Sequence, residues 1–333
     1  MKVIFNKNLQ YKFQNKFPHG IMFHHFHDNK LFFNSPGSIT ANQFQKIINF
    51  IGRINIIDAD LFLLKLQNNA LSKKDICITF DDALKCQYKI AIPILEKMKI
   101  KAFFFVPTGL INSKKITPEI VRHFIYVYCK GMKNFFYLFE KNCGLNLEKF
   151  YSKNINKIKI LKRNKFYSVE DIKYRLIRDS LKEDRFNEII SNLFKIKKYN
   201  YNSLISKTYM NIRDIKEIHN KNHVIGLHSH SHQMTTLFSK TNNLITDYKK
   251  NISEIKKILS VKNNEIKSMS FPFGVYNKKT LQILKKLNIK AGFLSDMITT
   301  KKSNLEMPRN NHVYVMREMN NKNLKVNSKK TDL

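Results

Sequence analysis

The stretch that decides the fold is residues 75–109, which begins with "DICITFDD" (75–82) and ends with "KAFFFVPTG" (101–109). Both quoted segments are short apolar runs closed by polar or turn residues, as expected of buried strands. Between them, "QYKIAIPILEKMKI" (87–100) has apolar residues at helical spacing, and Pro93 is tolerated only near the start of a helix. A strand, a helix and a second strand in this order predict a parallel sheet with right-handed crossovers.

The same alternation of strands and helices occurs on both sides of this unit. An N-terminal strand is predicted at "PHGIMFHHFH" (18–27), followed by a helix with a Thr cap at "TANQFQKIINFIG" (40–52). Later strands are predicted at "HVIGLH" (223–228), "SMSFPFG" (268–274) and "KAGFLSD" (290–296). Helices are predicted before or between them at "NIRDIKEIHN" (211–220), "LITDYKKNISEIKKIL" (244–259) and "KKTLQILKKLNI" (278–289). The sequence therefore predicts an α/β fold.

A segment of helical character, residues 112–210, breaks this rhythm and is interpreted as an insertion over one face of the sheet. We expect a main domain at 18–315 that contains this insertion. Residues 1–17 are interpreted as an N-terminal extension, and the polar, lysine-rich residues 316–333 as a loose, disordered tail.

Charge favours anionic partners, because 60 Lys and Arg residues against 25 Asp and Glu give a formal net charge of +35. Such partners include nucleic acid, acidic lipid and phosphorylated intermediates. The lysines are spread over nearly every segment, which argues against a dedicated nucleic-acid site with clustered basic and aromatic residues. Peripheral contact with an anionic membrane surface is compatible with the charge.

The N-terminal residues have no apolar core followed by a small-residue cleavage site, so no export signal is predicted. No apolar run approaches transmembrane length. The four cysteines form no CxxC pair and are interpreted as reduced, half-buried thiols. We therefore expect a cytoplasmic protein, with a peripheral position at the inner membrane as the alternative.

Two adjacent carboxylates, Asp81 and Asp82, end the strand predicted at 75–82. Adjacent acids at a strand end are commonly solvated loop residues. In a parallel α/β sheet or barrel, however, reactive groups converge at the C-terminal ends of the strands. Because side chains alternate along a strand, the two carboxylates are expected to point in different directions and to have different roles.

Histidines gather in "HVIGLHSHSHQ" (223–233), which holds four of the chain's 11. His228 and His232 can meet on one side of a helix or of a tight turn. Imidazole nitrogens together with a carboxylate oxygen suit zinc and similar divalent ions. A single loop histidine is more often a capping or surface residue, and His230 is expected to point away from the pair. The pair predicts a metal site.

A third segment, "SFPFG" (270–274), places Pro272 and Phe273 before a glycine at a strand end. This composition favours a rigid turn that presents a backbone N–H and an aromatic ring to a ligand. By itself the segment is a weak signal.

Together these segments resemble one family, the polysaccharide deacetylases, also called NodB-like proteins or carbohydrate esterase family 4. Thr79-Phe80-Asp81-Asp82 matches the TFDD strand end of the family, and residues 228–232 match its H-S/T-x-x-H segment. "MPRNNHV" (307–313) resembles the Pro-Arg strand near the end of many members. The resemblance covers roughly residues 18–315 in the family order.

The third family motif, Arg-x-Pro-aromatic, departs from the pattern, because Ser270 stands where the arginine is expected and Phe273 replaces the usual tyrosine. The Asp/Trp and Leu-x-x-His motifs of the family are not clear, and the chain has no tryptophan. The missing arginine would leave the catalytic base without its usual partner. Arg309 is the candidate replacement, with a structural ion pair elsewhere as the alternative.

The resemblance implies a distorted (β/α) barrel with the site at the C-terminal ends of its strands. It implies that Asp82, His228 and His232 bind one divalent metal ion, expected to be zinc, with cobalt or nickel as alternatives. Asp81 would be the general base. Hydrolysis of an amide needs a Lewis acid on the carbonyl and an activated water, and a metal ion beside a carboxylate supplies both.

The general acid is left open among four histidines. His312 is the preferred candidate, and it competes with His24, His25 and His27 of "MFHHFHD" (22–28), only some of which can face the site. Substrate contacts are assigned to His25 and to the turn residues Pro272 and Phe273.

The predicted function is metal-dependent removal of the N-acetyl group from an acetamido sugar in cell-surface glycan biosynthesis. In enzyme terms this is a hydrolase that acts on carbon–nitrogen bonds other than peptide bonds. The substrate would be an N-acetylated sugar or oligosaccharide, free or linked to a nucleotide or lipid carrier. The alternative from another class is a degenerate deacetylase-like protein that binds glycan or metal without turnover.

Overall fold

The computed structural model describes residues 11–331 apart from 14, 29, 112, 114–115, 162–167, 182, 234–240, 262–265 and 298–302. The chain divides into two compact units. Unit 1 comprises Met1–Asn112 and Ser206–Leu333, and unit 2 comprises Ser113–Ile205.

Unit 1 is built on a seven-stranded sheet in the order β6-β5-β4-β3-β2-β1-β7, and every strand pair is parallel. The strands are β1 (His19–Phe23), β2 (Ile76–Phe80), β3 (Phe103–Val106), β4 (Val224–Leu227), β5 (Ser268–Ser270), β6 (Ala291–Phe293) and β7 (Arg309–Asn311). All residues of β1, β2, β3, β5 and β6 are buried, which explains why β2, β3 and β6 are almost continuous apolar runs in the sequence.

The sheet curls until its two ends meet. Phe293 of β6 forms a parallel bridge with Met307, just before β7. Main-chain hydrogen bonds on both sides extend this pairing, from Leu294 N to Met307 O at 2.9 Å and from Arg309 N to Asp296 O at 2.9 Å. Because β7 also pairs with β1, the strands form a closed ring. The predicted distorted (β/α) barrel is confirmed.

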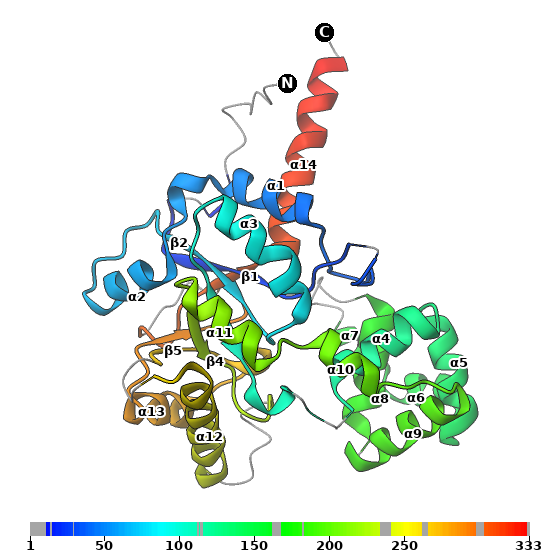
Figure 1. Cartoon of the computed structure of the whole chain (residues 1–333). Coiled ribbons are helices and arrows are strands. Elements are labelled where there is room, and N and C mark those ends of the chain that lie inside the picture. The colour runs from blue at the N-terminus through cyan, green and yellow to red at the C-terminus, as the bar shows by residue number, and fades with distance from the viewer. Residues whose placement is uncertain are drawn as a thin grey trace. The chain divides into compact units, whose positions relative to one another are not determined.

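Helices of unit 1 surround the strands (Figure 1). They are α1 (Ala41–Ile51), α2 (Ala59–Gln67), α3 (Ile92–Lys97), α11 (Ile212–Asn220), α12 (Thr241–Leu259), α13 (Lys278–Lys286) and α14 (His312–Thr331). α1 begins at the predicted Thr40, whose side chain and that of Gln43 form a reciprocal capping box. Pro93 lies in the first turn of α3, after a π-helical turn at Gln87–Ala91.

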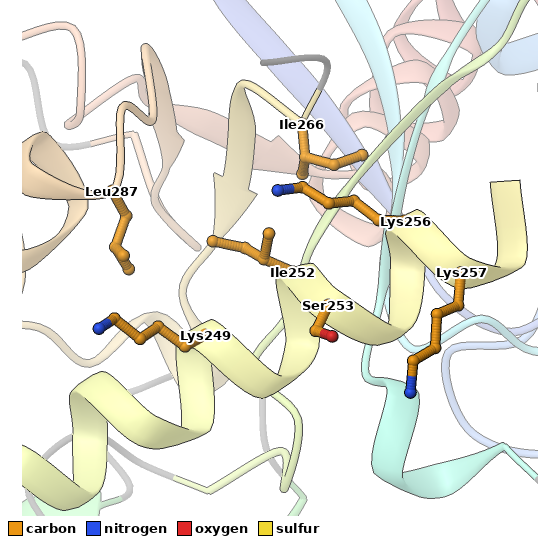
Figure 2. A pocket seen from close by; sticks show the side chains of 7 residues that line it. All are labelled: Lys249, Ile252, Ser253, Lys256, Lys257, Ile266 and Leu287. Atoms are coloured by element: carbon orange, nitrogen blue, oxygen red, sulfur yellow. The ribbon is translucent and has the colours of Figure 1, made fainter. Parts of the chain in front are cut away.

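One face of α12 is exposed and lines a surface pocket of about 480 Å³ (Figure 2). The pocket has a basic rim and an apolar floor. Its lining residues are Lys249, Ile252, Ser253, Lys256, Lys257, Ile266 and Leu287. The opposite side of α12 carries the buried residues of the helix and faces the barrel.

The interior of the barrel is apolar at one end and polar at the other. Phe103, Phe105 and Phe293 pack together inside the ring, with ring centroids 5.1 to 5.9 Å apart. Phe62 of α2 packs against Phe103 and Phe293, so α2 closes the apolar end. The polar end holds Asp81 and the other candidate site residues, which therefore lie next to this aromatic cluster.

In the described part of unit 2 the regular elements are all helices, joined by turns and loops. Its helices are α4 (Pro118–His123), a π-helical turn (Phe124–Tyr128), α5 (Met132–Cys143), α6 (Leu147–Lys153), α7 (Ile155–Leu161), α8 (Val169–Ser180) and α9 (Glu183–Ile196), and α10 (Asn202–Thr208) crosses its boundary. The unit has a core of its own, in which Phe124, Phe135 and Phe139 are fully buried. An apolar core of this kind is what an independently packed insertion requires.

The two ends of the chain differ from the sequence interpretation. Residues 316–331 were expected to form a loose tail, but they continue α14, whose first turn packs Val315 fully into the core. Within the interpreted N-terminal extension, Tyr11 is buried, and its hydroxyl accepts a hydrogen bond from Asn310 Nδ2 at 2.8 Å. In the described part of the chain, no helix is both long and apolar enough to cross a membrane.

Candidate active site

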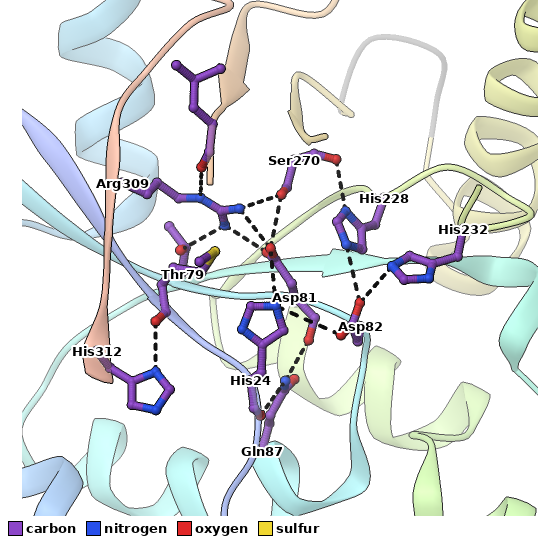
Figure 3. Close-up of polar contacts among 12 residues, drawn as sticks. His24, Thr79, Asp81, Asp82, Gln87, His228, His232, Ser270, Arg309 and His312 are labelled. Atoms are coloured by element: carbon purple, nitrogen blue, oxygen red, sulfur yellow. Dashed lines mark hydrogen bonds and ion pairs between the residues drawn. The ribbon is translucent and has the colours of Figure 1, made fainter. Parts of the chain in front are cut away.

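Asp82, His228 and His232 converge where β2 and β4 end (Figure 3). Oδ1 of Asp82 lies 3.3 Å from Nε2 of His228 and 3.0 Å from Nε2 of His232. The three possible ligand atoms all lie within 4.8 Å of one another. Two imidazole nitrogens and one carboxylate oxygen form a donor set that suits zinc and similar divalent ions.

The hydrogen bonds around these atoms fit a metal ion. Nδ1 of His228 lies 2.9 Å from the carbonyl oxygen of Ser270, so it carries a proton, and Nε2 is the ring atom that faces Asp82. Oδ1 of Asp82, the atom it faces, is buried and has no hydrogen-bond donor among the described residues. A carboxylate oxygen and an imidazole nitrogen this close need a positive charge between them, either a proton on the ring or a metal ion. The residues therefore fit the divalent metal ion that the sequence predicted.

The backbone explains how two adjacent aspartates reach different partners. Asp81 continues the alternation of β2, so it shares the barrel interior with Thr79 and Cys77. Asp82 and Ala83 then adopt positive φ angles of 77° and 51°. Such left-handed conformations are strained for residues with a side chain and occur preferentially at functional sites. The turn releases Asp82 from the strand and directs it to the two histidines.

Asp81 is bound by the guanidinium of Arg309 through two hydrogen bonds, from NH1 to Oδ1 at 2.8 Å and from NH2 to Oδ2 at 2.7 Å. The remaining guanidinium donors bond to Thr79 Oγ1 at 3.2 Å, to Ser270 Oγ at 2.7 Å and to the carbonyl of Leu294. All five N–H groups of this fully buried arginine are thus used.

Arg309 reaches Asp81 from the start of β7, through the barrel interior. The guanidinium carbon lies 5.8 Å from the ring centroid of Phe105, which forms its floor. Gly20 of β1 makes room, since a Cβ there would lie 3.0 Å from Cγ of Arg309. Ser270 stands where the family motif has its arginine, and its hydroxyl joins Arg309 to Oδ2 of Asp81 at 3.1 Å. The contact that the sequence suggested for Arg309 is therefore present.

Charges in the site hold both carboxylates ionised. Burial raises the pKa of Asp81, but the charges of Arg309 and His228 outweigh it and lower this pKa to about 2. Burial also raises the pKa of Asp82, yet His232 and His228 hold it well below its usual range. The pKa of His228 is raised, because the two carboxylates outweigh the effect of burial.

Of the four histidines considered as proton donors, His24 is the one that faces the carboxylates. Its Nε2 lies 3.8 Å from Oδ2 of Asp81 and 3.9 Å from Oδ2 of Asp82, and its side chain is 26% exposed. Gln87 fixes its backbone, since Nε2 of Gln87 donates to the carbonyls of His24 at 3.0 Å and Asp81 at 2.6 Å. Sequence reasoning did not single out Gln87, which lies in the π-helical turn after β2.

The preferred donor, His312, lies elsewhere. It is buried, its two ring nitrogens contact the carbonyls of Met22 at 3.1 Å and Gly37 at 2.9 Å, and its ring stacks on Phe23. Both ring nitrogens of His312 therefore point to main-chain carbonyls and not to the carboxylates, which favours His24 as the proton donor. His27 is also buried, with Nδ1 2.9 Å from Ser38 Oγ. His25 is half-buried, and its ring centroid lies 6.2 Å from that of His24.

His230 points away from the two facing histidines, as its place between them suggested. Its Nδ1 lies 2.9 Å from Thr108 Oγ1, and its carbonyl accepts a hydrogen bond from Gly109 N at 2.8 Å. Burial lowers the pKa of His230. His230 therefore anchors its loop to the end of β3 rather than joining Asp82.

The turn at Pro272–Gly274 presents an aromatic ring beside the site. Phe273 has a positive φ of 58°, is 43% exposed, and its ring centroid lies 5.2 Å from that of His232. Gly274 is required next to it, because its φ is +70° and a Cβ would lie 1.9 Å from Ser295 Oγ. Pro272 is buried and stiffens the turn.

Comparison with known proteins agrees with these motifs. The family model described as polysaccharide deacetylase matches residues 68–127 and 192–292. The two matched segments carry the aspartate pair, the histidine pair and the Pro272 turn. The gap between them falls within unit 2. No curated protein sequence matches the chain.

Solved structures of deacetylases share the fold. The deacetylase PplD from Streptococcus pyogenes, in complex with acetate, is 17% identical with a TM-score of 0.52, over 89% of this chain and 91% of that one. IcaB from Ammonifex degensii is 14% identical with a TM-score of 0.53, over 89% and 91%. A de-N-acetylase from Aggregatibacter actinomycetemcomitans is 12% identical with a TM-score of 0.52, over 88% and 93%.

At these identities the likeness to solved structures establishes the fold, and the family model adds the assignment. The predicted class of enzyme, a hydrolase of carbon–nitrogen bonds other than peptide bonds, is that of the matched family. The chain therefore carries a polysaccharide deacetylase domain, and the resemblance seen in its motifs is confirmed.

Proposed function

We propose that the protein is a metal-dependent hydrolase that removes the N-acetyl group from an acetamido sugar of a glycan. One observation carries the proposal. The buried Asp81–Arg309 pair lies beside the cluster of Asp82, His228 and His232, whose possible ligand atoms lie within 4.8 Å of one another. The cluster suits a cation, and the pair supplies an ionised carboxylate next to it.

Asp82, His228 and His232 would hold one divalent ion, for which we propose zinc, with cobalt or nickel as alternatives. When bound, the ion supplies Lewis-acid chemistry, which polarises an acetyl carbonyl and acidifies a water molecule. His228 is oriented for this task, because its Nδ1–H donates to the carbonyl of Ser270.

The other residues would move protons and orient the sugar. Asp81, held ionised and aimed by Arg309, would accept a proton from the attacking water as general base. His24 Nε2 lies 3.8 Å from Asp81 and 3.9 Å from Asp82 and would donate a proton to the leaving nitrogen. The exposed ring of Phe273 would pack against the sugar, and the half-buried His25, whose ring neighbours that of His24, would also contact it.

We propose a substrate from cell-surface glycan biosynthesis. A nucleotide- or lipid-linked sugar would suit the net charge of +35, as would contact with an anionic membrane. All four cysteines are buried free thiols, which supports our proposal of a reducing compartment, the cytoplasm.

The alternative of a degenerate protein rested on the missing motif arginine. Arg309 supplies a guanidinium at the same carboxylate, which favours a working enzyme.

The test is acetate release from oligosaccharides of N-acetylglucosamine by protein stripped of metal and then reloaded with zinc, cobalt or nickel. We expect release that depends on the added ion and is lost in His228→Ala. Stoichiometric metal binding without release from any N-acetylated sugar, free or carrier-linked, would favour the degenerate protein instead.

A further inference from the structure

We infer that Asp247 of α12 is a positioning residue for the loop His228–His232, here called the histidine loop, and that it sets the affinity of the metal site without being a ligand. The inference rests on the proposed metal site. Its evidence is a set of hydrogen bonds between α12 and the loop, in which Asn251 also takes part.

The carboxylate of Asp247 accepts three hydrogen bonds from the middle of the histidine loop. Its Oδ2 accepts from Ser229 Oγ at 2.7 Å and from the backbone N–H of His230 at 2.9 Å, and its Oδ1 accepts from the N–H of Ser231 at 2.9 Å. Asp247 is only 8% exposed. A buried carboxylate is costly unless donors surround it, and the three donors found in the described part of the chain belong to the histidine loop.

Ser229 passes this restraint on to a proposed ligand. Its Oγ donates to Asp247 and accepts a hydrogen bond from the backbone N–H of His232 at 3.1 Å. Ser229 and His232 both have positive φ angles, of 64° and 55°. Strained conformations of this kind persist only where surrounding contacts hold them, and the Asp247 contacts do so here.

Asn251, one helical turn after Asp247, fixes the start of the loop. Its Oδ1 accepts from the N–H of His228 at 3.1 Å, and its Nδ2 donates to the Val106 carbonyl at 3.0 Å and to Thr108 Oγ1 at 2.9 Å. The two side chains of α12 therefore restrain the backbone at both proposed histidine ligands. Metal affinity depends on such restraints, because residues that orient ligands typically contribute a factor of about 10 to 100.

Asp247→Asn is the most informative variant, because it removes the charge and one acceptor oxygen but keeps the size of the side chain. An amide offers one acceptor oxygen and turns an NH₂ group toward the loop donors, so at least one of the three hydrogen bonds is lost. The ligand atoms themselves are unchanged. Ser229→Ala removes the same connection from the loop side.

The experiment is titration of metal-free protein with zinc, in competition with a chromophoric chelator, together with the visible spectrum of cobalt-loaded protein. We expect Asp247→Asn and Ser229→Ala to raise the zinc Kd about 10- to 100-fold. We expect turnover to recover at saturating metal. Ser253→Ala, on the exposed face of α12, is the matched control and should bind zinc like the parent protein.

A zinc Kd within twofold of the parent in both folded variants would overturn the inference, even if their melting temperatures fell, because the contacts would then serve stability alone. If Asp247→Asn did not fold, Ser229→Ala would decide in its place. Failure of the parent protein to bind zinc would instead contradict the proposed metal site and with it this inference, so the two failures are distinguishable.

Discussion

Arg309 and Asp81 are 228 residues apart in the sequence and are joined in the barrel by two hydrogen bonds of 2.8 and 2.7 Å. The guanidinium comes from β7, whereas the family motif would place its arginine at Ser270 on β5. Because the strands close into a ring, β7 and β5 deliver side chains to the same interior space. A small serine on one strand and an arginine on the other therefore fill the position together.

We predict that Arg309→Lys lowers kcat by about 10- to 100-fold while zinc affinity stays unchanged. A lysine keeps the positive charge but cannot form the paired hydrogen bonds, and a charge-assisted hydrogen bond contributes about 1.5–3 kcal/mol. Steady-state kinetics on zinc-loaded protein measures the effect. Arg213→Lys, at an exposed position of α11, is the control. A kcat within twofold of the parent would show that Asp81 does not depend on the two-pronged contact.

Substitution of a proposed metal ligand should abolish zinc binding, whereas substitution of the neighbouring His230 should not. We predict that His228→Ala, His232→Ala and Asp82→Ala each abolish stoichiometric zinc binding, because each removes one of the three donor atoms that gather here among the described residues. His230→Ala should retain binding, since its ring contacts Thr108 instead. Elemental analysis of the purified variants measures the zinc bound per protein molecule. Equal loss of zinc in all four variants would indicate a different ligand set.

Much of the barrel could be predicted because each of its strands is recognisable from a short, local sequence pattern. The strand at 75–82 and the histidines at 223–233 were recognisable from a few consecutive residues, and topology then brings the ends of parallel strands together. The proton donor could not be chosen in this way. His24 and His312 occur in similar polar surroundings in the sequence, and only the packed structure reveals that two carbonyls hold the second.

Asp247 and Asn251 carry a recognisable pattern in the sequence. Along α12 the buried positions include Leu244, Tyr248 and Ile255, and the two polar residues lie on the same side of the helix. Polar side chains within an apolar stripe are expected to have buried partners. The pattern does not name those partners, because the histidine loop is remote in sequence.

Acid sensitivity of folding should arise partly at His223. Burial, with Lys101 and Lys221 nearby, lowers the pKa of His223 to about 3, and its Nδ1 accepts the N–H of Ala102 at 3.0 Å. A folded pKa below the unfolded value of about 6.5 means that the unfolded chain binds the proton first as the pH falls. The stabilisation is therefore complete above pH 6.5 and is lost as the pH falls toward 3.

We predict that this one group costs the folded state about 2 kcal/mol between pH 7.5 and pH 5. His223→Asn keeps an acceptor for Ala102 without a titrating ring, so the pH dependence should shrink by that amount. Urea unfolding of metal-free protein at the two pH values measures it, with His219→Asn, at a half-exposed position of α11, as the control. An unchanged pH dependence in His223→Asn would mean that the ring is already protonated or solvated in the folded state.

His24 and His312 can be distinguished as proton donors by one pair of variants. His24→Gln removes the only one of the two rings that lies within 4 Å of Asp81 and Asp82, so we predict a fall in kcat of about 100-fold or more. Zinc affinity should stay within a few-fold. His312→Gln should act differently, because its ring is buried between the carbonyls of Met22 and Gly37. We expect a lower melting temperature and a kcat close to that of the parent. Loss of turnover in folded, zinc-loaded His312→Gln, with turnover retained in His24→Gln, would reverse the assignment and require the loop after β1 to rearrange when the sugar binds.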